Sequence, residues 1–250
     1  MIAVRNLVKT IRNGAHEVQI IRDISFDVPS RQFVAVMGPS GSGKSTLLGL
    51  IAGLDAPTSG SITIDGLDIT KLREDELAQL RGEKLGFVFQ SYHLIPTLTA
   101  LENVMLPMEF SGGTNGAVSR AEHLLESVGL IERRDHYPAQ LSGGEQQRAA
   151  LARAFMMKPS VLLADEPTGN LDSENGRHVL ELLIRLNKDE GTTLVLVTHD
   201  ELLASHAERR IILRDGRISP LPPGEGGRRE ARARQGEHHE TAPGEGRHDE

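Results

Sequence analysis

A glycine-rich stretch between residues 38 and 46 contains the residue types that bind phosphate. In order, it contains Gly38, Pro39, Ser40, Gly41, Ser42, Gly43, Lys44, Ser45 and Thr46. Glycines let successive backbone N–H groups converge on an anion, and a helix that begins here adds the positive end of its dipole. The Lys44 ammonium can reach the β- and γ-phosphates of a nucleoside triphosphate, and the Ser45 hydroxyl can bind Mg²⁺. The stretch therefore predicts a phosphate-binding loop, or P-loop.

The segments on both sides of this loop are those that a P-loop requires. Residues 33–37 form a short apolar run rich in β-branched residues, as expected of a buried parallel strand. Residues 46–52 have the apolar density of a helix packed against a sheet. A strand, a glycine-rich turn and a helix in this order indicate a nucleotide site. The loop alone leaves kinases, GTPases, helicases and transport ATPases open.

A pair of carboxylates follows a second apolar run. Residues 161–164 predict a buried strand that ends at Asp165 and Glu166. Asp165 can hold Mg²⁺ directly or through water, and Glu166 is suited to polarise an attacking water molecule. The alternative is a strand that ends in ordinary surface acids.

A second helix start with anion-binding character lies in residues 141–148, Leu-Ser-Gly-Gly-Glu-Gln-Gln-Arg. Ser142, Gly143 and Gly144 open a predicted helix that runs to residue 157, and the N-terminus of this helix can receive an anion. The alternative is a surface helix that begins with glycines. Two such helix ends in one chain suggest a nucleotide bound between two protein surfaces.

The rest of the pattern predicts an α/β fold, with a P-loop NTPase core whose mostly parallel sheet is flanked by helices. Residues 2–28 alternate like strands around a turn near residue 14 and predict an N-terminal antiparallel β layer. Strand patterns vanish between about residues 91 and 158, where we expect an inserted helical subdomain. Further strands are predicted at 61–66, 85–89 and 193–197, and helices at 73–81, 101–108, 118–128 and 174–187.

Composition limits the possible partners and surroundings of the 250-residue chain. Its net charge of −7 argues against nucleic acid as the main partner, because a basic face would be needed. The chain has no cysteine, which fits a reducing cytoplasm. We find no signal peptide, and no apolar run approaches the ~20 residues needed to cross a bilayer. We therefore expect a soluble chain that reaches a membrane only through a partner.

The stretch 220–250 differs in composition from residues 1–219. Glycine, glutamate, arginine, histidine and proline dominate it, and it has almost no large apolar residue. Such a segment cannot bury enough surface to fold alone, so we expect a disordered polar tail. A metal site at His238 and His239, with neighbouring glutamates, is the alternative to a solvated tail.

Taken together, the motifs resemble those of the nucleotide-binding subunit of an ATP-binding-cassette (ABC) transporter, over residues 1–219. Six motifs occur in the order found in that family: Walker A at 38–46, the Q-loop at Gln90, the signature at 141–145, Walker B with the catalytic glutamate at 161–166, the D-loop at 170–172 and the switch histidine at His199.

This resemblance implies a head-to-tail dimer of two copies that closes on two ATP molecules. The implied catalytic residues are Lys44, Gln90, Glu166 and His199. Mg²⁺ would be served by Ser45, Gln90 and Asp165. The P-loop would bind the phosphates of one ATP, which Ser142, Gly143, Gly144 and the D-loop residue Asp172 of the other copy would help to enclose.

Residues 90–100, 141–148 and 165–172 resemble a narrower branch of lipoprotein-release ATPases, macrolide and antimicrobial-peptide efflux ATPases and a related cell-division ATPase. This implies a separate integral-membrane permease, attachment through it to the cytoplasmic face of the cell membrane, and a role in export or release. Residues 92–98 would lie near the groove for the permease, or else only pack the helical lobe.

The cell-division relative suggests an alternative, a regulatory ATPase that signals through a membrane partner without moving a substrate. A soluble ABC-type ATPase of translation or DNA repair fits less well. Such proteins usually carry two cassettes or a long coiled coil between the motifs, and this chain has neither.

One departure from the family gives a testable prediction. Many ABC subunits stack an aromatic ring on adenine, and the matching position here is Ile11. Isoleucine offers apolar contact without ring stacking, which contributes ~0.5–1.5 kcal/mol beyond area. We therefore predict weaker discrimination between ATP and GTP than is usual, measured as the ratio of kcat/KM for the two nucleotides. A strong stacking-dependent preference for ATP would mean that another residue fills this place.

Overall fold

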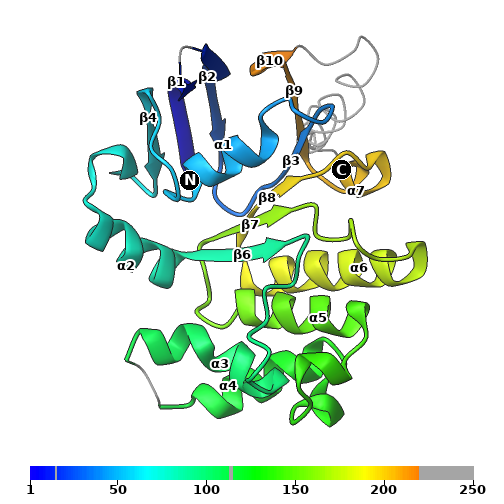
Figure 1. Cartoon of the computed structure of the whole chain (residues 1–250). Helices are drawn as coiled ribbons and strands as arrows, with labels where there is room; N and C mark the ends of the chain where they lie inside the picture. Colours follow the sequence, from blue (N-terminus) through cyan, green and yellow to red (C-terminus); the bar gives the residue numbers. More distant parts are fainter. Residues whose placement is uncertain (15, 113–114, 220–250) are drawn as a thin grey trace, which may run out of the picture. The chain divides into compact units, whose positions relative to one another are not determined.

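Two β-sheets organise the part of the chain that the computed structural model describes, residues 1–14, 16–112 and 115–219 (Figure 1). The six-stranded sheet has the order β10-β9-β3-β8-β7-β6, and the four-stranded sheet has the order β2-β1-β4-β5. The predicted tail and its histidine pair lie outside the described residues.

The six-stranded sheet is parallel from β9 to β6, and only β10 runs antiparallel to its neighbour. Parallel strands end at the same edge, and the segments that follow β3, β6, β7 and β8 carry the predicted functional residues. The strands are β3 (Phe33–Met37), β6 (Leu85–Phe89), β7 (Val161–Asp165), β8 (Thr193–Val197), β9 (Arg209–Arg214) and β10 (Arg217–Ser219).

The four-stranded sheet is antiparallel throughout, which confirms the predicted N-terminal β layer. Its long hairpin arms are β1 and β2, and their pairing runs from Ile2 opposite Val28 to Asn13 opposite His16. The strands are β1 (Ile2–Asn13), β2 (His16–Val28), β4 (Ser59–Ile64) and β5 (Leu67–Asp68).

Helices α1 to α6 occupy the predicted segments, with ends that shift by a few residues, whereas α7 and the 3₁₀ turns were not predicted. The described helices are α1 (Lys44–Ile51), α2 (Glu74–Lys84), α3 (Ala100–Phe110), α4 (Ala117–Ser127), α5 (Gly143–Ala154), α6 (Ser173–Glu190) and α7 (Glu201–Ser205), with 3₁₀ turns η1 (Ile69–Lys71), η2 (Ile131–Arg133) and η3 (Pro138–Gln140). None of the helices in the described ranges is long and apolar enough to cross a membrane.

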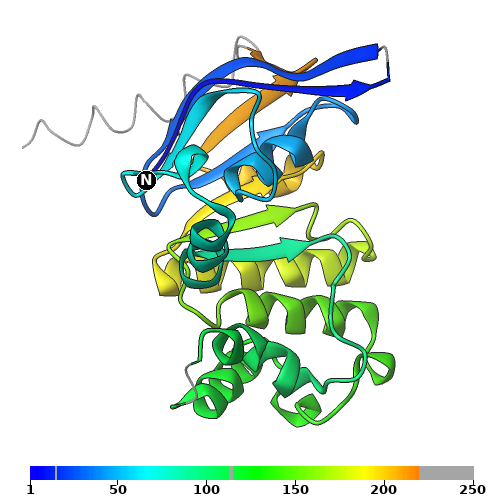
Figure 2. The ribbon, with the colours of Figure 1, turned by 60° about the vertical axis from the view of Figure 1, so that its left-hand side comes forward.

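Alternating side chains of the parallel strands supply two separate cores, one on each face of the six-stranded sheet. Along β3, Val34 and Val36 join a cluster with α1 and the antiparallel sheet, which we call the α1-side cluster. Phe33, Ala35 and Met37 join the helix-side cluster, formed with α3 to α6. The layers are visible in Figures 1 and 2, where α1 lies between the two sheets and α5 and α6 cover the other face of the parallel one.

Residues 91–158 contribute α3, α4 and α5, and no strand occurs among the described residues of this segment. Their apolar side chains belong to the helix-side cluster together with those of β7 and α6. A partly buried ion pair at 2.7 Å between Arg120 of α4 and Glu190 of α6 adds a polar link. The helices of this segment therefore pack on the same core as the parallel sheet.

Candidate active site

A cavity of about 970 Å³ lies at the edge where the parallel strands end. Four separate segments bring predicted residues to its wall, and these residues are Ser40, Gly41, Gly43, Lys44, Ser45, Thr46, Gln90, Glu166 and His199. The structure thus brings half of the residues that the sequence singled out to one cavity wall, although they lie as far apart in the chain as residues 40 and 199.

The P-loop has a backbone that only glycine accepts at two positions. Gly43, which precedes α1, has φ of 100°, and a Cβ there would lie 2.9 Å from the side chain of Ile21. A Cβ on Gly38 would lie 2.0 Å from the carbonyl oxygen of Leu213 in β9. The loop is therefore clamped between β2 on one side and β9 on the other.

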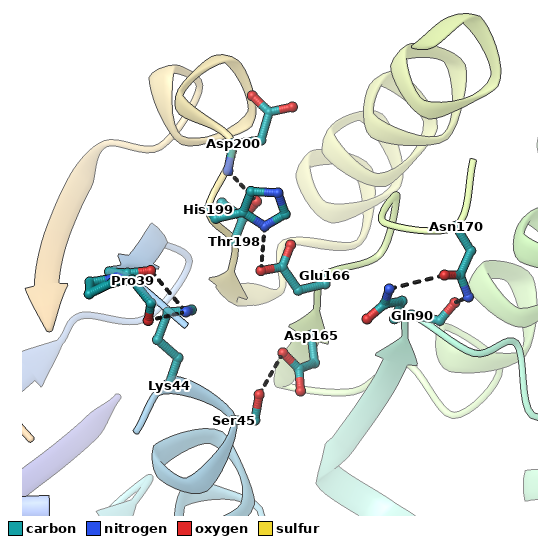
Figure 3. Close-up of polar contacts among 11 residues, drawn as sticks. Pro39, Lys44, Ser45, Gln90, Asp165, Glu166, Asn170, Thr198, His199 and Asp200 are labelled. Carbon is teal, nitrogen blue, oxygen red and sulfur yellow. Dashed lines mark hydrogen bonds and ion pairs between the residues drawn. The ribbon is translucent and has the colours of Figure 1, made fainter. Parts of the chain in front are cut away.

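Lys44 is held within the loop itself. Its Nζ donates to the carbonyl oxygens of Gly38, at 2.9 Å, and Pro39, at 3.1 Å (Figure 3). The residue is only 9% exposed, so its charge lies in a shielded position beside the cavity. An ammonium held in this way can exchange carbonyl partners for phosphate oxygens with little movement.

Ser45 and Asp165 provide a pair of oxygens at the N-terminal end of α1. The Ser45 hydroxyl donates to Asp165 Oδ1 at 3.2 Å (Figure 3). Burial raises the pKa of Asp165 above its usual value, and the nearby Glu166 charge raises it further, while the hydrogen bond from Ser45 and the Lys44 charge act in the opposite direction. Hydroxyl and carboxylate oxygens are ligands that Mg²⁺ prefers, so these residues fit that cation.

Glu166 combines a strained backbone with a directed carboxylate. Its φ is 46°, in the left-handed region, which costs on the order of 1–3 kcal/mol for such a residue. Its N–H donates to the Val197 carbonyl at 2.9 Å, and its carbonyl accepts from the Gly169 N–H at 3.0 Å. These bonds hold the turn that aims Glu166 into the cavity.

The Glu166 carboxylate contacts the His199 side chain, and both residues line the cavity. Glu166 Oε1 lies 2.9 Å from His199 Nδ1, and the His199 side chain is 74% exposed (Figure 3). The turn that carries His199 is fixed by Thr198, whose Oγ1 accepts from the Asp200 N–H at 3.0 Å. An acid and a histidine in contact, open to the cavity, can together orient a water molecule and a phosphate oxygen.

Gln90 is tied to the segment after Glu166 by two hydrogen bonds with Asn170. Gln90 Nε2 donates to Asn170 Oδ1 at 3.0 Å, and Asn170 Nδ2 donates to the Gln90 carbonyl at 3.0 Å (Figure 3). Gly169 permits this approach, because a Cβ there would lie 2.9 Å from Gln90 Nε2. The Q-loop and the D-loop are therefore joined within one chain.

Part of the cavity wall was not predicted from the sequence. It comes from β2, through Val18, Gln19, Ile20 and Arg22, and from the turn between β9 and β10, through Asp215 and Gly216. Gly216 joins these parts, because its N–H donates to the Ser42 carbonyl at 3.2 Å and its carbonyl accepts from the Arg22 N–H at 2.8 Å. The pair Asp215-Gly216 predicts a turn, but nothing in the sequence indicates that this turn contacts the P-loop.

Ile11 is not among the residues that line the cavity. It lies on β1 directly opposite Val18 of β2, and Val18 does line the cavity. Directly opposed residues share one face of the sheet, so Ile11 is one strand away on the same face. Its side chain is 46% exposed.

Ser142, Gly143, Gly144 and Asp172 also lie outside the cavity lining. Ser142 caps α5, where its N–H donates to Glu145 at 2.8 Å and lowers the pKa of that carboxyl. Asp172 caps α6, and hydrogen bonds from the Asn175 side chain and backbone lower the pKa of Asp172. A Cβ on Gly144 would lie 2.8 Å from Asn175 Oδ1. The second predicted anion-binding helix start is thus separate from the P-loop cavity of its own chain.

A P-loop after one parallel strand, a carboxylate pair after another and a histidine after a third define a P-loop nucleotide-binding ATPase. The family follows from a match of residues 21–169 to the family model described as ABC transporter. The chain therefore belongs to the ABC transporter family, and its cavity is that of an ATP-binding cassette.

Relatives of known name confirm the narrower resemblance. The lipoprotein-releasing system ATP-binding protein LolD of Syntrophus aciditrophicus is 46% identical over 87% of this chain and 98% of its own length. The macrolide export ATP-binding/permease protein MacB of Syntrophobacter fumaroxidans is 49% identical over 88% of this chain, which spans 31% of that longer protein.

A solved structure is similar over almost the whole described fold. It is the ATP-binding cassette MJ0796 of Methanocaldococcus jannaschii, described as a dimer in a post-hydrolysis state bound to ADP and Pi. The TM-score is 0.82 and the sequence identity 44%, over 88% of this chain and 97% of the other. The predicted α/β P-loop fold is thereby confirmed.

The raised pKa of Asp165 gives a prediction for the protein without nucleotide or metal. Because burial disfavours the charged carboxylate, the folded state binds a proton more tightly than the unfolded state, and stability falls as pH rises through the two pKa values. Asp165→Asn removes this cost and should raise the thermal unfolding midpoint at neutral pH. The gain should shrink as pH falls and the wild-type carboxyl takes up its proton, as measured by calorimetry from neutral to acid pH.

Asp172→Asn is the matched control, because the pKa of Asp172 is lowered and the sign reverses. That variant should be less stable than wild type at neutral pH, with a difference that fades in acid. An Asp165→Asn protein that is destabilised at neutral pH would contradict the assigned cause.

Proposed function

We propose that the chain is the ATP-hydrolysing subunit of a membrane transporter, which works as two copies and powers export or release through a separate permease. One observation carries this proposal. The helix start at Ser142–Gly144 is formed and capped, yet it lies outside the cavity that contains Lys44 and Glu166. A second copy can supply it.

The two-copy site follows from charge and geometry. The P-loop side contributes Lys44 and the amides of residues 41–46, and the N-terminus of α5 contributes a positive dipole end from the other copy. The triphosphate then lies between two positive surfaces and joins them. Asp172, at the start of α6, lies at the same junction in this proposal. The dimeric description of the MJ0796 cassette supports this arrangement.

The residues around Ser45 support hydrolysis with Mg²⁺. Ser45, Asp165 and Gln90 would hold the ion, which when bound neutralises charge on the phosphate oxygens. Glu166 acts on the attacking water, while His199 orients the Glu166 carboxylate and contacts the γ-phosphate. Hydrolysis divides the triphosphate, whose negative charge joins the two positive surfaces. The two copies then separate, and this movement is passed to a partner.

The partner is an integral-membrane permease, and an apolar groove of about 360 Å³ is suited to receive it. Phe87 and Phe89 of β6 and Leu106, Pro107 and Phe110 of α3 line this groove. Phe110 is 82% exposed and adjoins the other apolar residues of the groove, and a contiguous apolar surface of this kind is typical of an interaction site.

Residues 92–98 run beside the start of α3 and join the proposed permease surface. The buried Asn103 side chain holds this segment, because its amide donates to the Ile95, Leu98 and Thr99 carbonyls. Ile95 itself is exposed. A rigid segment that presents an apolar side chain can pass a movement of the cassette to a docked helix.

The names of the relatives favour transport over signalling without a substrate, because LolD is a lipoprotein-releasing protein and MacB a macrolide exporter. In this proposal, residues 1–219 are one ATPase domain with a helical subdomain at about 91–158. Through the permease the domain is attached to the cytoplasmic face of the cell membrane.

The two-copy mechanism predicts the behaviour of Glu166→Gln. Loss of the carboxylate should lower turnover by about 100-fold or more while ATP binding is kept, because positioned acid–base groups contribute about 10²–10⁴-fold. The variant should accumulate as an ATP-dependent dimer, measured by light scattering after size exclusion. Glu181→Gln, an exposed carboxylate on α6, is the control and should behave as wild type. Wild-type turnover in Glu166→Gln would remove Glu166 from the catalytic role.

The permease groove predicts the effect of Phe110→Asp. A charge in the apolar groove should abolish co-purification of the integral-membrane partner from detergent-solubilised native membranes. The ATPase rate of the isolated chain should stay within about twofold, because an exposed surface substitution leaves the fold unchanged. Val118→Asp, an exposed apolar residue on α4 outside the groove, should keep both properties. Equal loss of the partner in both variants would argue against this groove.

A further inference from the structure

Gln147 is a fully buried amide in the middle of α5, five residues after the helix start at Ser142. Its Nε2 donates to two backbone carbonyls from separate segments, that of Phe89 at 3.1 Å and that of Pro167 at 2.6 Å. Both hydrogens of the amide nitrogen are therefore used. The side chain links α5 to the end of β6 and to the turn after β7.

The two carbonyls flank residues of the active site. The Phe89 carbonyl belongs to the peptide group that leads into Gln90, and the Pro167 carbonyl belongs to the peptide group after the one that joins Glu166 to Pro167. A hydrogen bond to a carbonyl fixes the plane of its peptide group, and so limits the dihedral angles on both sides. Gln147 thus restrains the backbone at Gln90 and, at the same time, the turn that directly follows Glu166.

The restrained peptide group adjoins a strained conformation at Glu166. The left-handed φ of 46° is kept only if the surroundings hold it, and the bonds to Val197 and from Gly169 hold the residue from two sides. The bond from Gln147 to Pro167 holds the next residue of the same turn. Without it, the turn can relax and the carboxylate can move away from His199.

The chemistry of the amide argues against a packing role alone. The reverse orientation would direct Oε1 at two carbonyl oxygens, so the nitrogen must be the atom that faces them. In the present orientation Oε1 is buried, and it accepts no hydrogen bond from any residue in the described ranges. An apolar side chain of similar size would fill the space without this cost.

We propose that Gln147 is a positioning residue that couples the location of α5 to the catalytic geometry of Gln90 and Glu166 in the same chain. This rests on the proposed two-copy site, in which the start of α5 contacts the ATP of the other copy. A shift of α5 on closure then reaches both loops through one side chain. Arg153, near the end of α5, adds a parallel link by donating to the Tyr92 carbonyl at 2.9 Å.

The test compares Gln147→Met with a control at a second buried amide. Methionine keeps the length and removes both donors, so kcat should fall about tenfold or more while KM for ATP stays within about threefold, because misplacement by a fraction of an ångström lowers the rate but not binding. Asn187→Leu removes a buried amide that donates to Thr192 at the far end of α6. It should lower the unfolding midpoint while kcat stays near the wild-type value.

Gln147→Glu adds a readout that a purely structural role would not change. The ionised carboxylate cannot donate to either carbonyl, whereas the protonated acid can donate to one. The ratio of its kcat to that of the wild type should therefore rise as pH falls. A flat ratio, or a folded Gln147→Met with kcat within about twofold of wild type, would overturn the positioning role.

The double variant Glu166→Gln/Gln147→Met separates this inference from the proposed function. It should form the same ATP-dependent dimer as Glu166→Gln alone, since Gln147 contacts neither nucleotide nor the other copy in this proposal. If Glu166→Gln itself forms no such dimer, the proposed two-copy site is wrong. The proposed coupling of α5 to Gln90 and Glu166 is then also wrong, because it rests on that site. If only the double variant fails to dimerise, Gln147 acts on assembly and the positioning role is overturned.

Discussion

The parallel pairing of β3, β8, β7 and β6 is the constraint on which the active site depends. Their register places Phe89 beside Asp165, Asp165 beside Val197, and Val197 beside Val36. Because every strand of this row ends at the same level, four distant segments deliver an amide, two acids, a histidine and a lysine to one edge. The two cores on opposite faces fix this register, because a shift by one residue would exchange the side chains of both faces.

The free protein keeps several costs at this edge that ATP and its counterion would relieve. Lys44 is shielded and bound to carbonyls, the pKa of Asp165 is raised by burial, and Glu166 has a strained backbone. A ligand that interacts only with the folded state stabilises it, so bound nucleotide would offset these costs in the free energy of unfolding.

The sequence predicted the elements up to β8, the sheet class and just over half of the cavity wall, because motifs at strand ends carry both a local structure and a chemistry. It could not predict contacts that depend on how distant segments meet. Gln147 looks like any polar helical residue until its two carbonyl partners are known. The turn at Asp215 is visible as a turn, but its contact with the P-loop is not. Ile11 was assigned by matched position, and the sequence does not show that it pairs with Val18, which lines the cavity.

The place of β3 in the sheet also has a consequence for biosynthesis. This strand, which leads into the P-loop, pairs with β8 on one side and β9 on the other, and those strands begin only at Thr193 and Arg209. On the ribosome, the loop is translated early but has no lateral support until nearly all of the cassette has emerged. The nascent chain therefore gains its nucleotide site last, in one long-range step, and the emerging α1-side surface must stay soluble until then.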